Sequence, residues 1–238
     1  MILLLLWPHA PLAGIAVLAI SHALVLYPTL RPNVQWLGPV ITRFAAESNE
    51  VWLTIDDGPT EDTPALLDLL AARGVKATFF VKGALVEQHP ELVREIVARG
   101  HEVANHSQTH PSGSFWCLPP AALANEIERC NRALLAVTDQ QPRLFRAPVG
   151  MKNPGVHPQL RRRGLTLVGW TVRGFDSIES DCEKVAARIV PRVDAGAIVV
   201  MHQGREHSIR CIARVIDELQ QHGYSLVIPE LGRLKTKR

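Results

Sequence analysis

The chain has 238 residues, a formal net charge of +3 and four cysteines. This length fits one large domain or two small ones, and 47% apolar with 21% charged residues is ordinary for a globular protein with a sizeable core. So small a charge argues against a nucleic-acid-binding protein. The cysteines form no C-x-x-C pair, which argues against a cysteine zinc site and favours thiols in a reducing compartment, with two disulfides as the alternative: Cys117, Cys130, Cys182 and Cys211.

The N-terminal segment, 1–30, has no charged side chain and is apolar over about the length of one membrane span. The first basic residues, Arg31 and Arg43, follow it, and by the positive-inside tendency they favour a membrane-associated protein with its main domain in the cytoplasm. An export signal and a hairpin lying in one leaflet are the alternatives. We therefore expect a membrane segment at 1–30, a linker at 31–50 and one folded domain at 51–238.

From Val51 onward, apolar strand-like runs alternate with amphipathic helix-like segments. Strands are expected at 51–55, 77–81, 102–104, 143–146, 165–171, 197–201 and 224–228, and helices at 64–73, 90–99, 119–137, 182–193 and 209–222. This alternation predicts an α/β fold in which helices cover a parallel sheet, either as a barrel or as an open doubly wound sheet. No glycine-rich phosphate-binding motif occurs, so a nucleotide-binding fold has no support.

Polar, reactive residues gather where the predicted strands end. They are Asp56-Asp57, the run 105–110, the run 146–150, the run 174–177 and the run 202–204. In barrels and open sheets of this type, the active site lies at the carboxyl ends of the strands. Five strand ends of this kind therefore predict an active site at one end of the sheet.

Two carboxylates, Asp56 and Asp57, follow a buried apolar run, and each needs a cation, hydrogen bonds or a metal. Neighbouring side chains on an extended backbone point in opposite directions, so we expect the two to have different partners. A polar turn before the next helix is the alternative. His106 and His110 are four residues apart; on one helical turn they would face the same way and could share a metal with one carboxylate.

Three further residues have both a structural and a chemical interpretation. His202 closes an apolar strand, so it is either a core histidine or a general acid opposite a carboxylate base. Arg146, at another strand end, is either a surface arginine or the fixed cation beside a buried carboxylate. Asp176 is either a turn residue or the carboxylate that holds and polarises His202.

These residues lie in motifs that resemble those of the polysaccharide deacetylase family, the NodB-homology type of carbohydrate esterase family 4. The motifs occur in the same order and are T-I-D-D-G-P at 54–59, H-S-Q-T-H at 106–110, R-A-P-V-G at 146–150, the aspartate at 176 and V-M-H at 200–202. The resemblance covers roughly residues 51–229. It implies a distorted (β/α)7-like barrel with parallel strands, preceded here by the hydrophobic N-terminal segment.

The resemblance also implies a function. Members of this family are metal-dependent hydrolases that remove an N-acetyl group from an amino sugar in a polymer, oligomer or lipid-linked saccharide. It implies that Asp57, His106 and His110 bind the divalent metal, usually zinc. The membrane segment suggests a substrate at the bilayer, such as a glycolipid or a nascent envelope glycan.

The resemblance assigns the remaining roles as well. Asp56 would be the general base for a metal-activated water, and Arg146 would orient it. His202 would be the general acid, and Asp176 would tune it. The alternatives are a deformylase or non-sugar amidohydrolase on the same fold, or a sugar-binding barrel without activity.

The chain departs from the family pattern in two places. Ile55 replaces the more usual phenylalanine, and Ser177 stands where the family often has a tryptophan that lines the substrate groove. Candidates for that surface are Phe115, Trp116, Pro148 and Trp170. Core packing is the alternative for the aromatic candidates.

Overall fold

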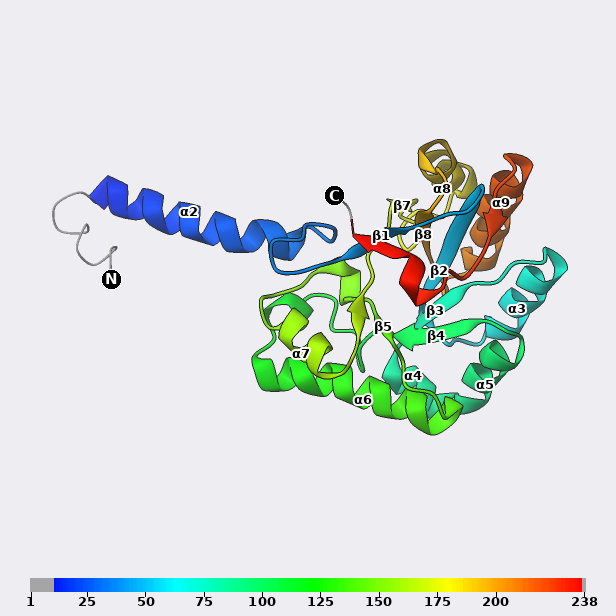
Figure 1. Ribbon diagram of the computed structural model, residues 1–238, viewed down its shortest axis with the longest axis horizontal. Coiled ribbons are helices and arrows are strands. Elements are labelled where there is room, and N and C mark those ends of the chain that lie inside the picture. Colours follow the sequence, from blue (N-terminus) through cyan, green and yellow to red (C-terminus); the bar gives the residue numbers. More distant parts are fainter. Residues whose placement is uncertain (1–10, 237–238) are drawn as a thin grey trace.

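In the computed structural model, which describes residues 11–236, a long apolar helix leads into a domain built on one curved sheet. This helix, α2 (Pro11–Leu30), extends away from the domain (Figure 1). It is long and apolar enough to cross a membrane, and apolar side chains such as Leu12 and Ile20 are exposed. A membrane anchor and a signal sequence both fit these features. The remainder of the predicted membrane segment, 1–10, lies outside the described residues.

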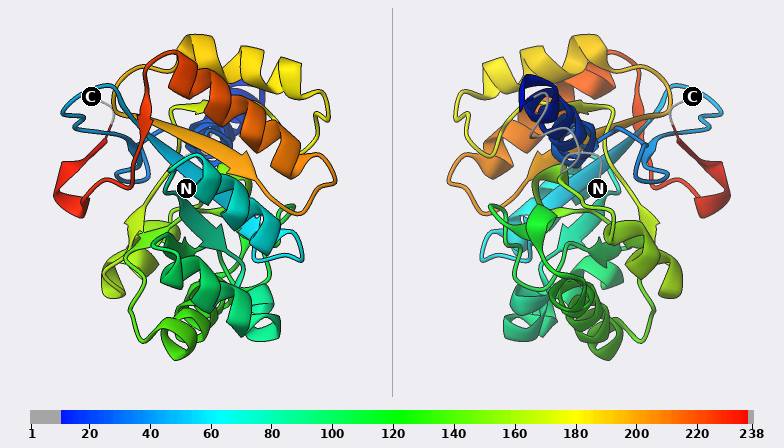
Figure 2. Two further views of the ribbon diagram at one scale, coloured as in Figure 1. Left: turned by 90° about the vertical axis from the view of Figure 1, so that its right-hand side faces the viewer. Right: turned by 90° about the vertical axis from the view of Figure 1, so that its left-hand side faces the viewer.

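Ten strands form the sheet in the described part of the chain: β1 (Ile41–Phe44), β2 (Glu50–Gly58), β3 (Thr78–Val81), β4 (Glu102–Asn105), β5 (Leu144–Phe145), β6 (Thr166–Leu167), β7 (Val172–Arg173), β8 (Ala197–His202), β9 (Ser225–Leu226) and β10 (Leu234–Thr236). Helices surround the sheet (Figure 2). They are α3 (Thr63–Ala72), α4 (Gly83–Gln88), α5 (Pro90–Ala98), α6 (Pro120–Thr138), α7 (Val156–Arg162), α8 (Cys182–Ile189) and α9 (Ser208–Gln221).

The sheet follows the order β10-β1-β8-β2-β3-β4-β5-β6, and β7 and β9 add to β8 and β2. Every pair from β8 to β6 is parallel, whereas β1 is antiparallel to both β8 and β10. A single bridge between Ile41 and Val168 joins β1 to the chain just after β6. The sheet therefore curls into a distorted barrel, and the predicted α/β barrel is confirmed. The expectation of parallel strands throughout is wrong at one edge, where β1 and β10 are antiparallel.

Two features of this architecture differ from the expectation. The stretch 31–50, expected as a linker, contains β1, which is part of the domain sheet. The helices α4 and α7 were not predicted, and both are short, with six and seven residues. Short helices and four-residue strands carry too few turns of an apolar pattern to stand out in a sequence.

The central strands are buried on both faces, and alternate residues belong to different parts of the core. In β2, Leu53 and Ile55 pack against the helices, whereas Trp52 faces the inside of the barrel. Because side chains alternate along a strand, Thr54 and Asp56 share the inner face with Trp52. The strand thus brings one carboxylate to the mouth of the barrel, the end at which the parallel strands finish.

A disulfide connects two of the outer helices. Cys182, the first residue of α8, is bonded to Cys211 in α9, while Cys117 and Cys130 are free. The expectation of free thiols is therefore wrong for Cys182 and Cys211, and the alternative of two disulfides is met by one bond. Disulfides persist in oxidising compartments, so this bond is relevant to the question of which side of a membrane the domain occupies.

Candidate active site

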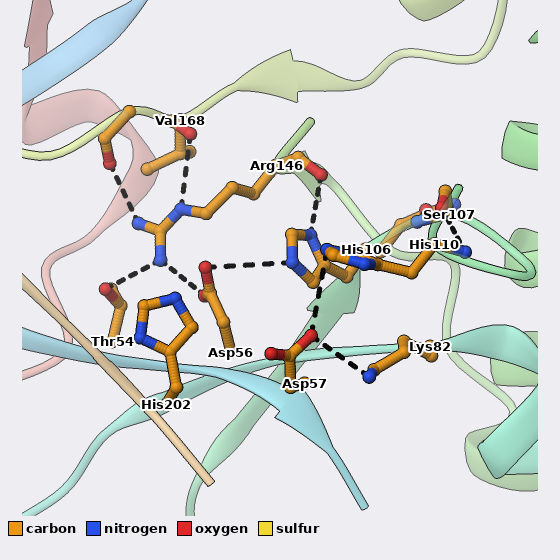
Figure 3. Close-up of polar contacts among 12 residues, drawn as sticks. Thr54, Asp56, Asp57, Lys82, His106, Ser107, His110, Arg146, Val168 and His202 are labelled. Carbon is orange, nitrogen blue, oxygen red and sulfur yellow. Dashed lines mark hydrogen bonds and ion pairs between the residues drawn. The ribbon is translucent and has the colours of Figure 1, made fainter. Parts of the chain in front are cut away.

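Four strand ends bring the predicted reactive residues together at the mouth of the barrel (Figure 3). Asp56 lies opposite His202 in the register of β2 and β8. The Nε2 atom of His106, just after β4, is 3.7 Å from Oδ2 of Asp56. Arg146 follows β5 and reaches Asp56 from the other side. The predicted gathering of these side chains at one end of the sheet is confirmed.

Asp57 turns toward a different set of partners from Asp56. Its backbone is left-handed, with φ 78°, and the pairing of β2 with β3 shifts register between Asp56 and Gly58. The sequence predicted different partners for Asp56 and Asp57 because side chains alternate along an extended strand. The two residues do have different partners, but the cause is this local break in the strand. Left-handed backbone is uncommon outside glycine and persists where surrounding contacts fix it, often at functional sites.

The two histidines that accompany Asp57 lie on a turn and not on the predicted helix. Ser107 and His110 have positive φ angles of 65° and 54°, and the Ser107 amide donates to Oδ1 of Asn105. The rings of His106 and His110 nevertheless lie 4.6 Å apart between centroids. The helical reason for pairing them was therefore wrong, while their proximity was correctly predicted.

A metal ion fits this group of side chains. One ligand atom each from Asp57, His106 and His110 lies within 4.8 Å of the others. Among the described residues, the buried Oδ1 atom of Asp57 accepts no hydrogen bond, and its charge is met by Nζ of Lys82 at 3.1 Å. Two imidazoles and a carboxylate are ligands suited to zinc and other transition metals.

Protonation of these residues also suits a metal ligand set. Burial lowers the pKa of His106, and burial together with the His106 ring lowers the pKa of His110 to about 4, so both are neutral at pH 7. The carbonyl of Arg146 accepts a hydrogen bond from Nδ1 of His106, leaving Nε2 for the cluster. Burial would raise the pKa of Asp57, but the electrostatic interactions with His106, Lys82 and His110 outweigh it and lower the pKa to about 2.

Asp56 forms a buried ion pair that fixes its orientation. Nη1 of Arg146 is 2.6 Å from Oδ1 of Asp56 and also donates to the hydroxyl of Thr54 at 2.8 Å. The other nitrogens of the guanidinium donate to the carbonyls of Val168 and Gly169. Its Cζ atom lies 4.1 Å from the ring centroid of Phe80. Arg146 is thus the fixed cation expected from the sequence, not a surface arginine.

His202 and Asp176 form a second pair beside the first. Oδ1 of Asp176 is 3.0 Å from Nδ1 of His202, and Oδ2 accepts a hydrogen bond from the His202 amide at 2.6 Å. Burial alone would lower the pKa of His202. The hydrogen bond and charge of Asp176, with the charges of Asp56 and Asp57, outweigh burial and raise the pKa. His202 is thereby favoured as a proton donor.

Lys82 is a residue of this site that sequence reasoning missed. It directly follows β3, and its Nζ atom is 3.1 Å from Oδ1 of Asp57. Lys82 stands at the end of a strand, as the other site residues do, so the same rule would have identified it. Its ammonium group adds positive charge beside Asp57.

The candidates for the substrate surface lie mainly in the interior. Phe115 is fully buried against Phe145, at 6.0 Å between ring centroids, which favours the packing alternative. Pro148 and Trp170 are also buried, and Trp116 is half-buried. The exposed apolar side chains next to the site motifs include Val149, Phe175 and Ile178, which the sequence analysis did not select.

Comparisons with known proteins agree with the fold. The family model described as polysaccharide deacetylase matches residues 45–168. A chitooligosaccharide deacetylase of Bradyrhizobium sp. (strain ANU 289) is 35% identical over 201 residues, covering 77% of this chain and 91% of that protein. The peptidoglycan-N-acetylglucosamine deacetylase PgdA of Listeria monocytogenes is 32% identical over 184 residues, covering 77% of this chain and 38% of that protein.

A solved structure shares the architecture as well. The family 4 carbohydrate esterase from Streptomyces lividans, in complex with acetate, has a TM-score of 0.72 and 32% sequence identity, and covers 80% of this chain and 99% of that one. This chain has the same barrel architecture, and its mouth carries an Asp/His/His group beside two carboxylate-centred pairs. The chain belongs to the polysaccharide deacetylase family, and it is a hydrolase that acts on N-acetyl amide bonds.

Proposed function

We propose that this protein removes the N-acetyl group from an amino sugar of a saccharide, using a divalent metal. The observation that carries the proposal is the side-by-side arrangement of the Asp57–His106–His110 group, the Asp56–Arg146 pair and the His202–Asp176 pair. The substrates named for the relatives, chitooligosaccharide and peptidoglycan N-acetylglucosamine, support an amino-sugar substrate. The acetate in the Streptomyces lividans structure is the acid that such a reaction would release.

Asp57, His106 and His110 would hold the metal, and two nitrogens with one carboxylate oxygen favour zinc. When bound, a divalent cation supplies Lewis-acid polarisation of the amide carbonyl and makes water a stronger acid. Two features of the chain support these ligands: the neutral state of both histidines and the buried Oδ1 atom of Asp57. Lys82, whose Nζ atom is 3.1 Å from Oδ1 of Asp57, would moderate the charge of that carboxylate.

In the proposed reaction, Asp56 takes a proton from the attacking water as the water oxygen adds to the acyl carbon. Arg146 keeps the carboxylate of Asp56 aimed at the mouth of the barrel through its 2.6 Å contact. His202 then donates a proton to the amide nitrogen, the carbon–nitrogen bond breaks, and acetate and a free amine result. Because water is the nucleophile, no covalent bond to the enzyme is required.

A panel of N-acyl sugars tests this function. The protein loaded with zinc is incubated with N-acetyl and N-formyl glucosamine oligomers and with a simple non-sugar acetamide, and the released acid is identified. We expect acetate from the N-acetylated sugars. Preferential release of formate, or equal turnover of the non-sugar amide, would favour the alternative amidohydrolases, and no acid from any of them would contradict the proposed function.

The pH profile tests the role of the His202–Asp176 pair. As a general acid, His202 must carry its proton, so activity should fall as the pH rises through the raised pKa of its ring. Replacing Asp176 by asparagine removes the charge that raises this pKa. We expect the alkaline limb of kcat/KM to move to lower pH, because the charge-assisted hydrogen bond that favours the protonated ring is lost. An alkaline limb that stays in place in Asp176→Asn would remove His202 from this role.

For the location of the domain, we propose attachment to a membrane through α2 with the barrel on the oxidising side. The cytoplasmic orientation expected from the sequence depended on reduced cysteines and on two arginines. Cys182 and Cys211 are bonded, which supports an oxidising compartment. Arg43 lies in β1, and its Nη2 atom is 2.5 Å from Oδ1 of Asp194. Its position is explained by the fold of the domain, so it is not evidence for the orientation of the protein in the membrane.

The end of α2 is attached to the loop that follows the R-A-P-V-G motif. Lys152 is buried, and its Nζ atom donates to the carbonyls of Arg31 and Pro32 at 2.8 and 2.9 Å. Nδ2 of the Asn33 side chain also donates to the carbonyl of Trp170 at 2.8 Å. These contacts connect the membrane segment to residues beside the site, which supports a substrate that is close to the bilayer, such as a lipid-linked saccharide.

Cys117 offers a direct test of this orientation, because it is both free and exposed. In intact cells, a membrane-impermeant maleimide should label the full-length protein, and the variant Cys117→Ser should lose the label. Cys130 is fully buried and will not compete. Labelling that appears only after lysis would return the domain to the cytoplasm.

A further inference from the structure

Arg173 is a cation at the mouth of the barrel that the proposed reaction does not use. It is the last residue of β7, where Val172 packs in the outer core against the helices. Because side chains alternate along a strand, Arg173 faces the inside of the barrel. It pairs in register with Val200, whose side chain lies in the inner core, and Val200 precedes His202 by two residues. Arg173 therefore stands beside the proposed general acid.

Aromatic side chains hold the guanidinium of Arg173 in place. Its Cζ atom lies 4.0 Å from the ring centroid of Phe175 and 5.5 Å from that of Trp170. The same Trp170 ring lies 5.9 Å from Cζ of Arg146 on the catalytic side. Stacking of this kind fixes a planar guanidinium while leaving the hydrogen-bonding edges of its nitrogens available.

The charges at the mouth are paired, except for that of Arg173. Asp56 pairs with Arg146, Asp57 lies 3.1 Å from Lys82, and both oxygens of Asp176 bond to His202. In the described part of the chain, the guanidinium of Arg173 makes neither a hydrogen bond nor an ion pair. Burial lowers the pKa of Arg173 and the charge of Asp176 opposes this effect, so the half-buried guanidinium is only partly solvated by water. Its nitrogens therefore remain available to an anionic ligand.

The surface next to Arg173 is accessible to a ligand. Phe175 is 39% exposed and Ile178 is 83% exposed, and both are close in sequence to Asp176. Phe175 has a φ of 63°, so this loop holds its side chain in an unusual backbone conformation beside the guanidinium. An exposed apolar surface next to an unpaired cation suits a molecule that is partly apolar and carries a negative group.

We propose that Arg173 binds a carboxylate or phosphate group on the saccharide that carries the N-acetyl sugar, and so selects acidic amino-sugar chains over neutral ones. This inference rests on the proposed function. The planar guanidinium matches the paired oxygens of carboxylate and phosphate, and such charge-assisted bonds are the strong ones. The chemistry is the same for a sugar acid within a polymer and for the phosphate of a lipid-linked sugar.

Three probes of similar length distinguish these substrates. The first is a neutral tetramer of N-acetylglucosamine. The second is a tetramer in which N-acetylglucosamine alternates with N-acetylmuramic acid, which adds carboxylates. The third is an N-acetylglucosamine oligomer with a phosphate at its reducing end. The full-length protein in detergent is compared with Arg173→Gln, Arg173→Lys and Arg214→Gln, since Arg214 lies exposed on α9 and its replacement changes the net charge equally.

For the wild type, kcat/KM on at least one anionic probe should exceed that on the neutral probe by about tenfold or more, the effect of one hydrogen bond to a charged group. Arg173→Gln should bring this ratio close to one, mainly by raising KM for the anionic probe. Arg173→Lys should keep part of the preference, and Arg214→Gln should keep all of it. The probe that shows the ratio identifies carboxylate or phosphate as the partner. A wild-type ratio near one, or a ratio that Arg173→Gln leaves unchanged, would overturn the proposal.

Binding measured without turnover separates this inference from the proposed function. If no probe releases acetate, the proposed function fails, and isothermal titration of the same anionic probes into the full-length protein still tests Arg173. Binding that is about tenfold weaker in Arg173→Gln than in Arg214→Gln would support the anion site. Equal affinity in the two variants would overturn it.

Discussion

Replacing Asp56 by asparagine is expected to lower kcat/KM for deacetylation by about 10²- to 10⁴-fold, the range typical for loss of a general base. Asparagine has nearly the same shape and can still accept a hydrogen bond from Arg146, which now donates to Oδ1 of Asp56 at 2.6 Å. It cannot take a proton from water at neutral pH. Because Asp56 is outside the Asp57–His106–His110 group, the metal content of Asp56→Asn, measured by elemental analysis, should match that of the wild type.

Asp57→Ala is the matched comparison, because it alters the adjacent carboxylate. The substitution removes one of three ligand atoms that lie within 4.8 Å of one another. Loss of a residue that only hydrogen-bonds to a metal ligand lowers metal affinity by roughly 10- to 100-fold, and the affinity of Asp57→Ala should fall by more than that. The two variants should therefore both be inactive but differ in metal content. Full turnover of Asp56→Asn would refute the base assignment, and normal metal content in Asp57→Ala would refute the ligand assignment.

The positions of Asp56, Arg146 and His202 could be predicted because they follow from regular structure. Parallel strands finish at the same edge, so residues that directly follow an apolar run in the sequence meet in space. Alternation along β2 then gives Asp56 the inner face it shares with Trp52. Applied to the end of 77–81, the same rule would also have identified Lys82.

Other features depend on contacts that the sequence does not display. The direction of Asp57 depends on a register shift and a positive φ, which neighbouring elements impose on the end of β2. The bond between Cys182 and Cys211, 29 residues apart, depends on how α8 packs on α9. The strand β1 was hidden in an apparent linker, because its partners β8 and β10 lie more than 150 positions further along the chain.

Arg146→Met is expected to lower the free energy of unfolding by about 3 to 5 kcal/mol, because it leaves the buried carboxylate of Asp56 without its cation. The side chain of Arg146 is fully buried, and its nitrogens also serve the hydroxyl of Thr54 and the carbonyls of Val168 and Gly169. Methionine fills much of the same volume without supplying a donor. Urea unfolding of the full-length protein in detergent measures the loss.

The double variant Asp56→Asn/Arg146→Met separates an unpaired charge from lost packing. If the unpaired carboxylate causes most of the loss, neutralising Asp56 should restore a large part of the stability that Arg146→Met removes. Activity should stay low in the double variant, because the base is still absent. If instead Arg146→Met unfolds within about 1 kcal/mol of the wild type, water or another group compensates Asp56. Arg146 would then not be what fixes the base, and the orientation proposed for Asp56 would lose its support.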